Sequence, residues 1–166
     1  KTNIYIIKCT MSDYQYKSYK TVATDEGPFR TGDILTLPNN FFIGSRIISN
    51  IAFPQKGINK KGYNLLDNDK LLMSNLKKFS IKFYKILKQI KKSEGPVFIY
   101  SNFKEYGGLK SFIKVLEYHN FKNYKDFGEG IKRFAVWTGD EKHEMKEEIK
   151  EVYNQIDNAD GSKLHI

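Results

Sequence analysis

The sequence predicts an α/β protein in which helices cover both faces of a parallel β-sheet. The main evidence is the run at residues 97–100, where four apolar or aromatic residues follow one another without alternation and stop at two small polar ones. A strand that is apolar on both faces belongs inside a sheet that is covered from both sides. The second half of the chain also alternates between helical and strand patterns, which favours right-handed βαβ crossovers.

The first half is less regular. A β-rich run at residues 4–7 predicts a strand, and Ser12 is a good N-cap for a helix that continues to about residue 23. Residues 25–70 hold scattered Gly, Pro and Asn without sustained periodicity, so we expect a long irregular excursion there. Over residues 72–90 apolar side chains recur at spacings of three and four, which predicts one amphipathic helix. Its lysine-rich face is either a solvated surface, which is the usual case, or a nucleic-acid contact.

The second half carries the regular alternation. Its pattern predicts a helix over residues 109–119, a second buried strand at 134–137, a helix with its apolar face through 145–156, and the start of a third strand at 163–166. The chain begins at Lys1 rather than Met and stops inside that third strand pattern. We therefore expect a piece of a longer polypeptide.

Composition narrows the classes of protein. The 28 Lys and Arg against 19 Asp and Glu give a net charge of +9. This excess fits a polyanionic partner such as nucleic acid, and it fits equally the Lys-, Asn-, Ile- and Tyr-rich composition that AT-rich coding DNA produces. Cys9 is the only cysteine, no apolar run approaches the roughly 20 residues of a membrane span, and no signal peptide precedes the first strand. We expect an intracellular protein without a membrane partner.

Several kinds of site are missing from the sequence. It contains neither a Gly-x-x-x-x-Gly-Lys-Ser/Thr phosphate loop nor a Gly-x-Gly-x-x-Gly turn. Its three histidines are scattered and have no Cys or carboxylate at the spacing of metal ligands, so we expect no metal site. Polar residues do follow the two buried strands, namely Ser101 with Asn102 and Thr138 with Gly139. Ligands of open α/β sheets bind outside these carboxyl ends.

Four segments, in order, are similar to motifs of one helicase family. Residues 7–19 resemble a Met-Ser-x-x-Gln-x-x-x-Tyr segment that links two lobes, and residues 45–54 resemble a Ser-Arg-x-x-Ser-Asn-hydrophobic-x-Phe-Pro segment. Residues 80–82 resemble a Ser-x-Lys helix start, and residues 98–103 resemble a strand that ends in Ser-x-Phe. The chain thus resembles the second RecA-like lobe of superfamily 2 helicases, most of all the Swi/Snf-like branch and its relatives in large DNA viruses of the poxvirus and giant-virus kind.

Three further positions match this family in part. Gly139 stands where the family has a Gly, and Tyr153 with Asn154 stands where it has a Phe-Asn pair. Lys146 stands where it has an Arg, which retains the charge but loses bidentate geometry.

The resemblance implies a three-layer RecA-like fold with a parallel sheet, present as an incomplete lobe. Residues 1–70 would form an inter-lobe linker and insertion, and residues 71–166 the second lobe, truncated at its C-terminal end. The phosphate loop would lie before Lys1, and the Gly-rich motif with the arginine finger after Ile166. ATP and Mg²⁺ would then be used by the full-length parent, while this fragment would bind neither, contain no catalytic residue and be inactive alone.

The implied function is ATP-dependent helicase or translocase activity of the parent, with this fragment gripping the nucleic-acid backbone. Ser101, Asn102 and Lys104 would contact phosphates, and Thr138 with Gly139 would form a second contact. The notable alternative for Ser101 and Asn102 is a cap of the next helix. The resemblance further implies that Lys82 and Lys146 face the first helicase lobe of the same polypeptide. We expect DNA rather than RNA as the nucleic-acid partner, and we expect the protein in the host cytoplasm or the virion.

Two other functions remain open from the residues. One is a non-catalytic basic α/β module of a viral transcription complex that binds a protein partner. The other is a Rossmann-like transferase, which would need a Gly-rich loop after the first strand, where residues 10–12 do not supply one.

Overall fold

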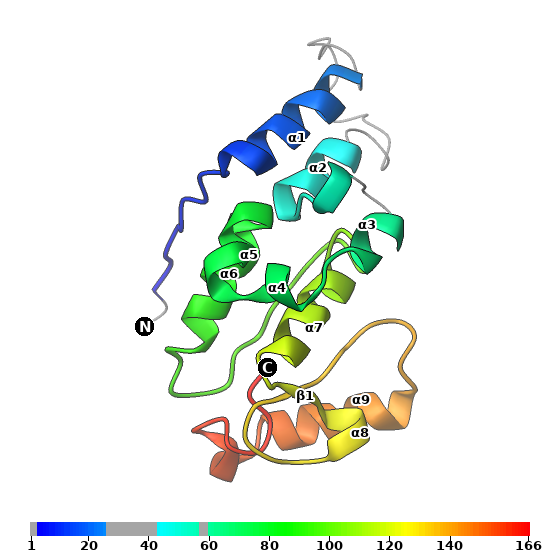
Figure 1. Ribbon diagram of the computed structural model, residues 1–166. Helices are drawn as coiled ribbons and strands as arrows, with labels where there is room; N and C mark the ends of the chain where they lie inside the picture. The colour runs from blue at the N-terminus through cyan, green and yellow to red at the C-terminus, as the bar shows by residue number, and fades with distance from the viewer. Residues whose placement is uncertain (1–2, 26–42, 57–59) are drawn as a thin grey trace. The chain divides into compact units, whose positions relative to one another are not determined.

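Helices dominate the computed structural model, which describes residues 3–25, 43–56 and 60–166 (Figure 1). Helix accounts for 53% of the structure and strand for only 3%, so the predicted three-layer RecA-like sheet with helices on both faces is wrong. The described helices and strands are α1 (Asp13–Asp25), α2 (Ile43–Asn50), η2 (Pro54–Lys56), α3 (Lys60–Asn64), α4 (Asn68–Leu71), α5 (Met73–Phe79), α6 (Ile81–Ile90), α7 (Leu109–Tyr118), β1 (Lys122–Asn123), α8 (Tyr124–Phe127), β2 (Arg133–Phe134), α9 (His143–Tyr153) and η3 (Ile156–Asn158).

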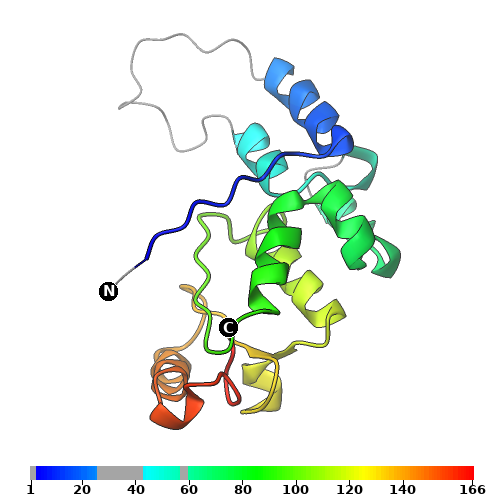
Figure 2. The same cartoon turned by 90° about the vertical axis from the view of Figure 1, so that its left-hand side faces the viewer.

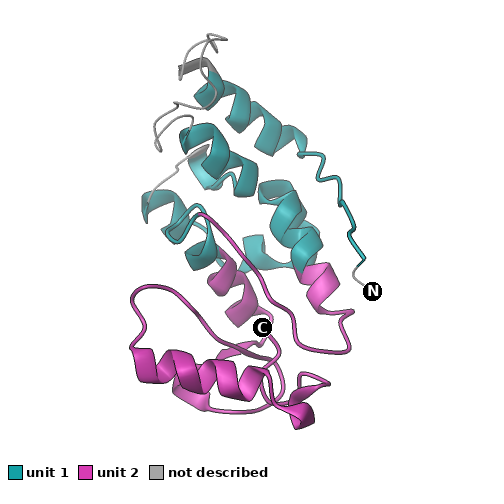
Figure 3. Ribbon diagram, turned by 180° about the vertical axis from the view of Figure 1, so that it is seen from behind, with its two compact units in different colours: residues 1–86, 103–111 teal, residues 87–102, 112–166 magenta. Residues whose placement is uncertain are grey.

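The chain divides into two compact units (Figure 3). Unit 1 comprises residues 1–86 and 103–111, and unit 2 comprises residues 87–102 and 112–166. The buried apolar side chains of unit 1 include Ile48, Ile51, Phe53, Leu66 and Leu76. In unit 2, a core cluster is formed by Tyr124, Ile149, Val152 and Leu164. Each unit therefore has an apolar core of its own.

The runs predicted as strands at residues 4–7 and 97–100 belong to no ladder in the described part of the chain. Residues 97–101 form neither helix nor ladder, and Phe98 and Tyr100 are 78% and 76% exposed. The run at residues 4–7 lies in the open segment before α1, and its side chains are also exposed (Figure 2). An apolar run shows that side chains favour burial, but a strand also needs a second backbone to complete its hydrogen bonds. That second requirement is not met here, which explains the error.

The first predicted helix is confirmed with its cap. The hydroxyl oxygen of Ser12 accepts a hydrogen bond from the amide of Gln15 at 3.0 Å, as expected of an N-cap residue at the start of α1. The predicted single helix over residues 72–90 is instead two helices, α5 and α6, with Ser80 in extended conformation between them. Ser80 Oγ accepts from the amide of Phe83 at 3.0 Å and so caps the second helix. A polar side chain inside an apolar pattern thus divides one helix into two.

The predicted irregular excursion contains helices where it is described. α2 and α3 lie within residues 25–70, and α4 begins there, while residues 26–42 and 57–59 are outside the described residues. Four residues of α2 are buried. Asp67 caps α4 by accepting from the amide of Lys70 at 3.3 Å. Gly, Pro and Asn therefore separate short helices here rather than exclude them.

The observed sheet of unit 2 is a parallel pair, β1 with β2. The last residues of the chain lie beside β2, since the amide of His165 donates to the carbonyl of Arg133 at 3.0 Å and the amide of Ala135 donates to that of Ile166 at 2.8 Å. The amide of Val97 donates to the carbonyl of His165 at 2.7 Å. The predicted strands at 134–137 and 163–166 are thus reduced to a two-residue ladder and a few backbone hydrogen bonds. The helix expected at 109–119 is confirmed as α7. The helix expected through 145–156 is α9, but it ends at Tyr153, and Ile156 lies in η3 and is 95% exposed.

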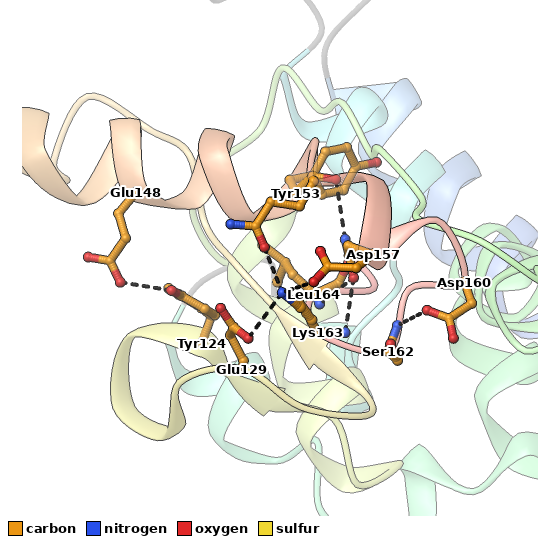
Figure 4. Close-up of polar contacts among 11 residues, drawn as sticks. Tyr124, Glu129, Glu148, Tyr153, Asp157, Asp160, Ser162, Lys163 and Leu164 are labelled. Carbon is orange, nitrogen blue, oxygen red and sulfur yellow. Dashed lines mark hydrogen bonds and ion pairs between the residues drawn. The ribbon is translucent and has the colours of Figure 1, made fainter.

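Asn158 and Lys163 hold the C-terminal turn of unit 2. The Asn158 side chain is fully buried; its oxygen accepts from the amides of Lys163 and Leu164 at 2.9 and 3.0 Å. The ammonium group of Lys163 lies 2.7 Å from the Asp157 carboxylate, a contact that raises the pKa of this lysine (Figure 4). These bonds fold the segment after α9 back on itself, in a turn near residues 158–161.

Candidate nucleic-acid interface

Asn102 presents a side-chain donor to solvent at the end of the apolar run in unit 2. Its Oδ1 accepts the Tyr100 hydroxyl at 2.7 Å, and both side chains are exposed. The bond occupies the oxygen of the carboxamide, so the nitrogen is oriented as a donor, which is the group that a phosphate oxygen requires. Ser101, beside it, is half-buried.

The start of α7 is where the helix-cap alternative would place a bond from this pair. The first amides of that helix donate to the carbonyl oxygens of Phe103 and Lys104, at 2.9 and 3.0 Å. Backbone groups therefore satisfy the helix start. Lys104 belongs to unit 1, and its side chain is exposed.

Thr138 and Gly139 lie in the loop between β2 and α9. Both the amide and the hydroxyl of Thr138 donate to the Glu141 carboxylate, at 2.7 and 2.6 Å. Burial raises the pKa of Glu141, but the two bonds from Thr138 outweigh it, so that the pKa is lowered. A Cβ at Gly139 would meet no atom within 4 Å. A phosphate at this loop would have open space, but it would compete with Glu141 for the Thr138 donors.

The two lysines predicted for a lobe interface have different surroundings. Lys82, in α6, donates from Nζ to Asn50 Oδ1 at 2.6 Å and is half-buried. Lys146 lies on α9 of unit 2 and is also half-buried.

The structure brings the helicase-like motifs of unit 1 together through polar side chains that bond across the motif segments. We call them the motif junction, which consists of the buried Gln15, Asn50 and Ser80 and the half-buried Lys82. Gln15 Nε2 donates to the carbonyl of Ile48 at 2.8 Å, and its Oε1 accepts from the amide of Ile81 at 3.4 Å. The Ser80 hydroxyl donates to the carbonyl of Asn50. Gln15 and Ser80 are completely buried.

The motif junction explains why polar residues occur at these motif positions. Buried polar groups must find partners, and here each partner comes from a different motif segment. The Asn50 side chain adds a bond from Nδ2 to the carbonyl of Gly107 at 3.0 Å, which ties α2 to the loop before α7. Sequence reasoning identified these residues as motif members but missed their structural role. The available signal was a polar residue within an apolar helical pattern, as at Ser80.

Other site types find no support in the described residues. Within them, no group of three His, Cys, Asp or Glu side chains could hold a metal ion. A search of the same residues finds no helix with the length and apolarity needed to cross a membrane.

Comparison with known proteins finds a viral relative that matches the whole chain. Over 169 residues the chain is 43% identical to a protein of Acanthamoeba polyphaga mimivirus named "Putative ATP-dependent RNA helicase". The match covers 100% of this chain and 30% of that protein. No family model matches the chain, and no solved structure matches it. The expected relation to a giant-virus helicase is thereby supported, whereas the expected preference for DNA is not.

Proposed function

We propose that this chain is a segment of an ATP-dependent nucleic-acid helicase or translocase, in which it supplies second-lobe grip on the backbone and part of the inter-lobe ATP cleft. The observation that carries the proposal is the 43% identity across the whole chain to the mimivirus protein named as a helicase. In this assignment residues 1–70 link the lobes and residues 71–166 belong to the second lobe. ATP and Mg²⁺ are proposed to act in the full-length protein, since the relative is named as ATP-dependent. This chain itself contains no phosphate-loop motif.

The grip is assigned to Ser101, Asn102 and Lys104, with Thr138 and Gly139 as the second contact. The exposed carboxamide of Asn102 and the open space above Gly139 support this assignment. Hydroxyl, amide and ammonium donors of this kind position a strand by its phosphates without reading its sequence. RNA is the first substrate to test, since the name of the relative specifies RNA.

Lys82 and Lys146 are proposed to face the first lobe. In the described residues, the ammonium group of Lys82 is bound to Asn50, so its contribution would be to orient the start of α6 as well as to add charge. Lys146 retains the positive charge that the family places at this position with Arg.

Nucleic-acid-stimulated ATPase activity of the full-length protein tests the proposal. Ser101→Ala combined with Asn102→Ala should weaken stimulation by single-stranded RNA and leave ATPase without nucleic acid unchanged. Ser74→Ala combined with Gln89→Ala, at exposed helix positions, is the matched control. Equal stimulation of both double variants would remove the grip assignment.

A second candidate function is a module that binds a protein partner without catalysis. It is favoured by the exposed apolar side chains of unit 2, among them Phe98, Tyr100 and Trp137. An absence of ATPase activity from the full-length protein with either RNA or DNA would support this candidate over the motor.

A further inference from the structure

The positive charge of the chain is divided unequally between its units. Unit 1 contains sixteen Lys and Arg against seven Asp and Glu, and unit 2 contains twelve of each. The whole net charge of +9 therefore belongs to unit 1. Cations that neutralise phosphates supply most of the affinity for a nucleic-acid strand. Ser101, Asn102 and Thr138 of the proposed grip lie in the neutral unit, and Lys104, in unit 1, is its one assigned cation, so the grip would be short of charge.

Unit 1 also places cations against aromatic rings around the loop before α7. The guanidinium of Arg46, in α2, lies 4.9 Å from the ring centroid of Phe103. The ammonium of Lys110 lies 4.5 Å from the ring centroid of Tyr106, and that ring lies 5.1 Å from the ring of Tyr63, in α3. We name these residues the aromatic–basic cluster, which consists of Arg46, Tyr63, Phe103, Lys104, Tyr106 and Lys110.

The loop that carries half of this cluster is held rigidly. A Cβ at Gly108 would lie 1.8 Å from the carbonyl oxygen of Phe103, so that only glycine fits there. A Cβ at Gly107 would lie 2.6 Å from Cγ2 of Ile47 in α2. The side chain of Asn50 donates to the carbonyl of Gly107 at 3.0 Å. A surface that is already ordered loses little entropy when a ligand binds.

The exposure of the cluster suits a ligand with both charge and flat rings. Arg46, Lys104 and Lys110 are exposed, and the aromatic rings are half-buried. The acidic neighbour Glu105 lies 3.7 Å from Lys110, but an ion pair between exposed groups is weak. Cation–aromatic pairs alone contribute about 0.5–1 kcal/mol each at exposed sites, which explains the local packing but not the net charge of +9 in unit 1.

The geometry points to a second nucleic-acid contact on unit 1, at which the aromatic–basic cluster binds a single strand. The exposed parts of these half-buried rings can stack on unpaired bases, while Arg46, Lys104 and Lys110 neutralise phosphates. A duplex hides its base faces, so rings would add little to duplex binding. The inference rests on the proposed function, because it takes a nucleic-acid strand as the partner, and it assigns to unit 1 the charge that the grip in unit 2 lacks.

Fluorescence anisotropy of the full-length protein with labelled oligouridylate and with a labelled DNA duplex of equal length tests the inference. Tyr106→Leu should weaken oligouridylate binding about 5- to 150-fold, the range expected when one stacked base loses its aromatic partner. Tyr106→Phe should retain binding, which separates stacking from loss of the hydroxyl. Tyr118→Leu in unit 2 is the matched aromatic control, and thermal denaturation checks that each variant is folded.

Charge is tested separately through the salt dependence. Lys110→Gln should reduce the slope of log affinity against log salt by about 0.7 for a single strand, the value of one lost phosphate contact. Lys125→Gln, at an exposed position of unit 2, should leave the slope unchanged.

The outcomes separate the two proposals. If the cluster variants bind oligouridylate as the wild type does, while the Ser101→Ala and Asn102→Ala variant does not, the inference fails and the proposed function stands. If Tyr106→Leu weakens duplex and single strand equally, stacking is excluded and the inference also fails. If the wild type binds neither probe, the proposed function itself is overturned.

Discussion

Replacing Asn158 by alanine should destabilise unit 2 by about 4 kcal/mol, at about 1 kcal/mol net for each of four hydrogen bonds lost. Besides accepting from the amides of Lys163 and Leu164, the side chain donates to the carbonyls of Tyr153 and Leu164, at 3.2 and 2.9 Å. Asn158 and Leu164 are both fully buried, so water cannot replace the missing partner. The change is a large part of the about 5–15 kcal/mol by which domains are stable.

Native-state hydrogen exchange of the full-length protein measures this effect locally. The amides of Lys163 and Leu164 should lose protection first, because they donate to the side chain that is removed. Asp160→Ala is the control, since the exposed Asp160 carboxylate accepts only at the surface, from the amide of Ser162 at 3.0 Å. A change below about 1 kcal/mol at Leu164 would show that the buried bonds contribute less than a single ordinary hydrogen bond, and the reasoning would be refuted.

The remaining predictions concern the other contacts described above. Glu141→Gln should strengthen single-strand binding in an anisotropy titration if Thr138 contacts phosphate, because the carboxylate competes for its donors; unchanged affinity would count against Thr138. Since the pKa of Glu141 is lowered from its ordinary value of 4.5, its stabilising bonds are present above that pH and are lost as the pH falls through the folded-state pKa. The protection of the Thr138 amide against hydrogen exchange, relative to its intrinsic rate, should therefore fall in acid. Gln15→Leu should lower the free energy of unfolding by about 1–3 kcal/mol, measured by urea denaturation, because a buried carbonyl loses its donor. Gly108→Ala should lower it by about 2 kcal/mol or more, because the new Cβ would collide with backbone at Phe103, and full stability of that variant would refute the close approach.

In unit 1, motif residues have a structural role that the sequence did not predict. The motifs were expected to mark contacts with ligands and with another lobe, and the residues named for these roles were Lys82 and the strand-end positions. The structure shows that Gln15, Asn50 and Ser80 first join the motif segments to one another. Lys82 takes part through Asn50. The strand-end assignments remain predictions that binding experiments must test.

Local signals in the sequence were sufficient to predict α1, α7 and most of α9. Ser12 caps α1 through the amide of Gln15, three residues away, and the spacing of apolar residues correctly predicted α7 and α9. Such signals act within one or two turns of the chain, so they can be read without knowledge of the rest of the fold. The turn after α9 was predictable for the same reason, since the bonds of Asn158 to Lys163 and Leu164 span five and six residues.

Tertiary structure alone decided which segments meet. The runs at residues 97–100 and 134–137 have apolar side chains that suit strands. A ladder also requires a second backbone segment, and a local sequence pattern does not identify which distant segment supplies it. The contacts between Gln15 and Ile81 and between Asn50 and Gly107 span 66 and 57 residues. Such long-range contacts place residues 103–111 in unit 1, and with them the cations and rings of the aromatic–basic cluster. The sequence by itself determined the net charge and the local signals for α1, α7 and α9. Only the packing of distant segments determined that all of the excess positive charge lies in unit 1.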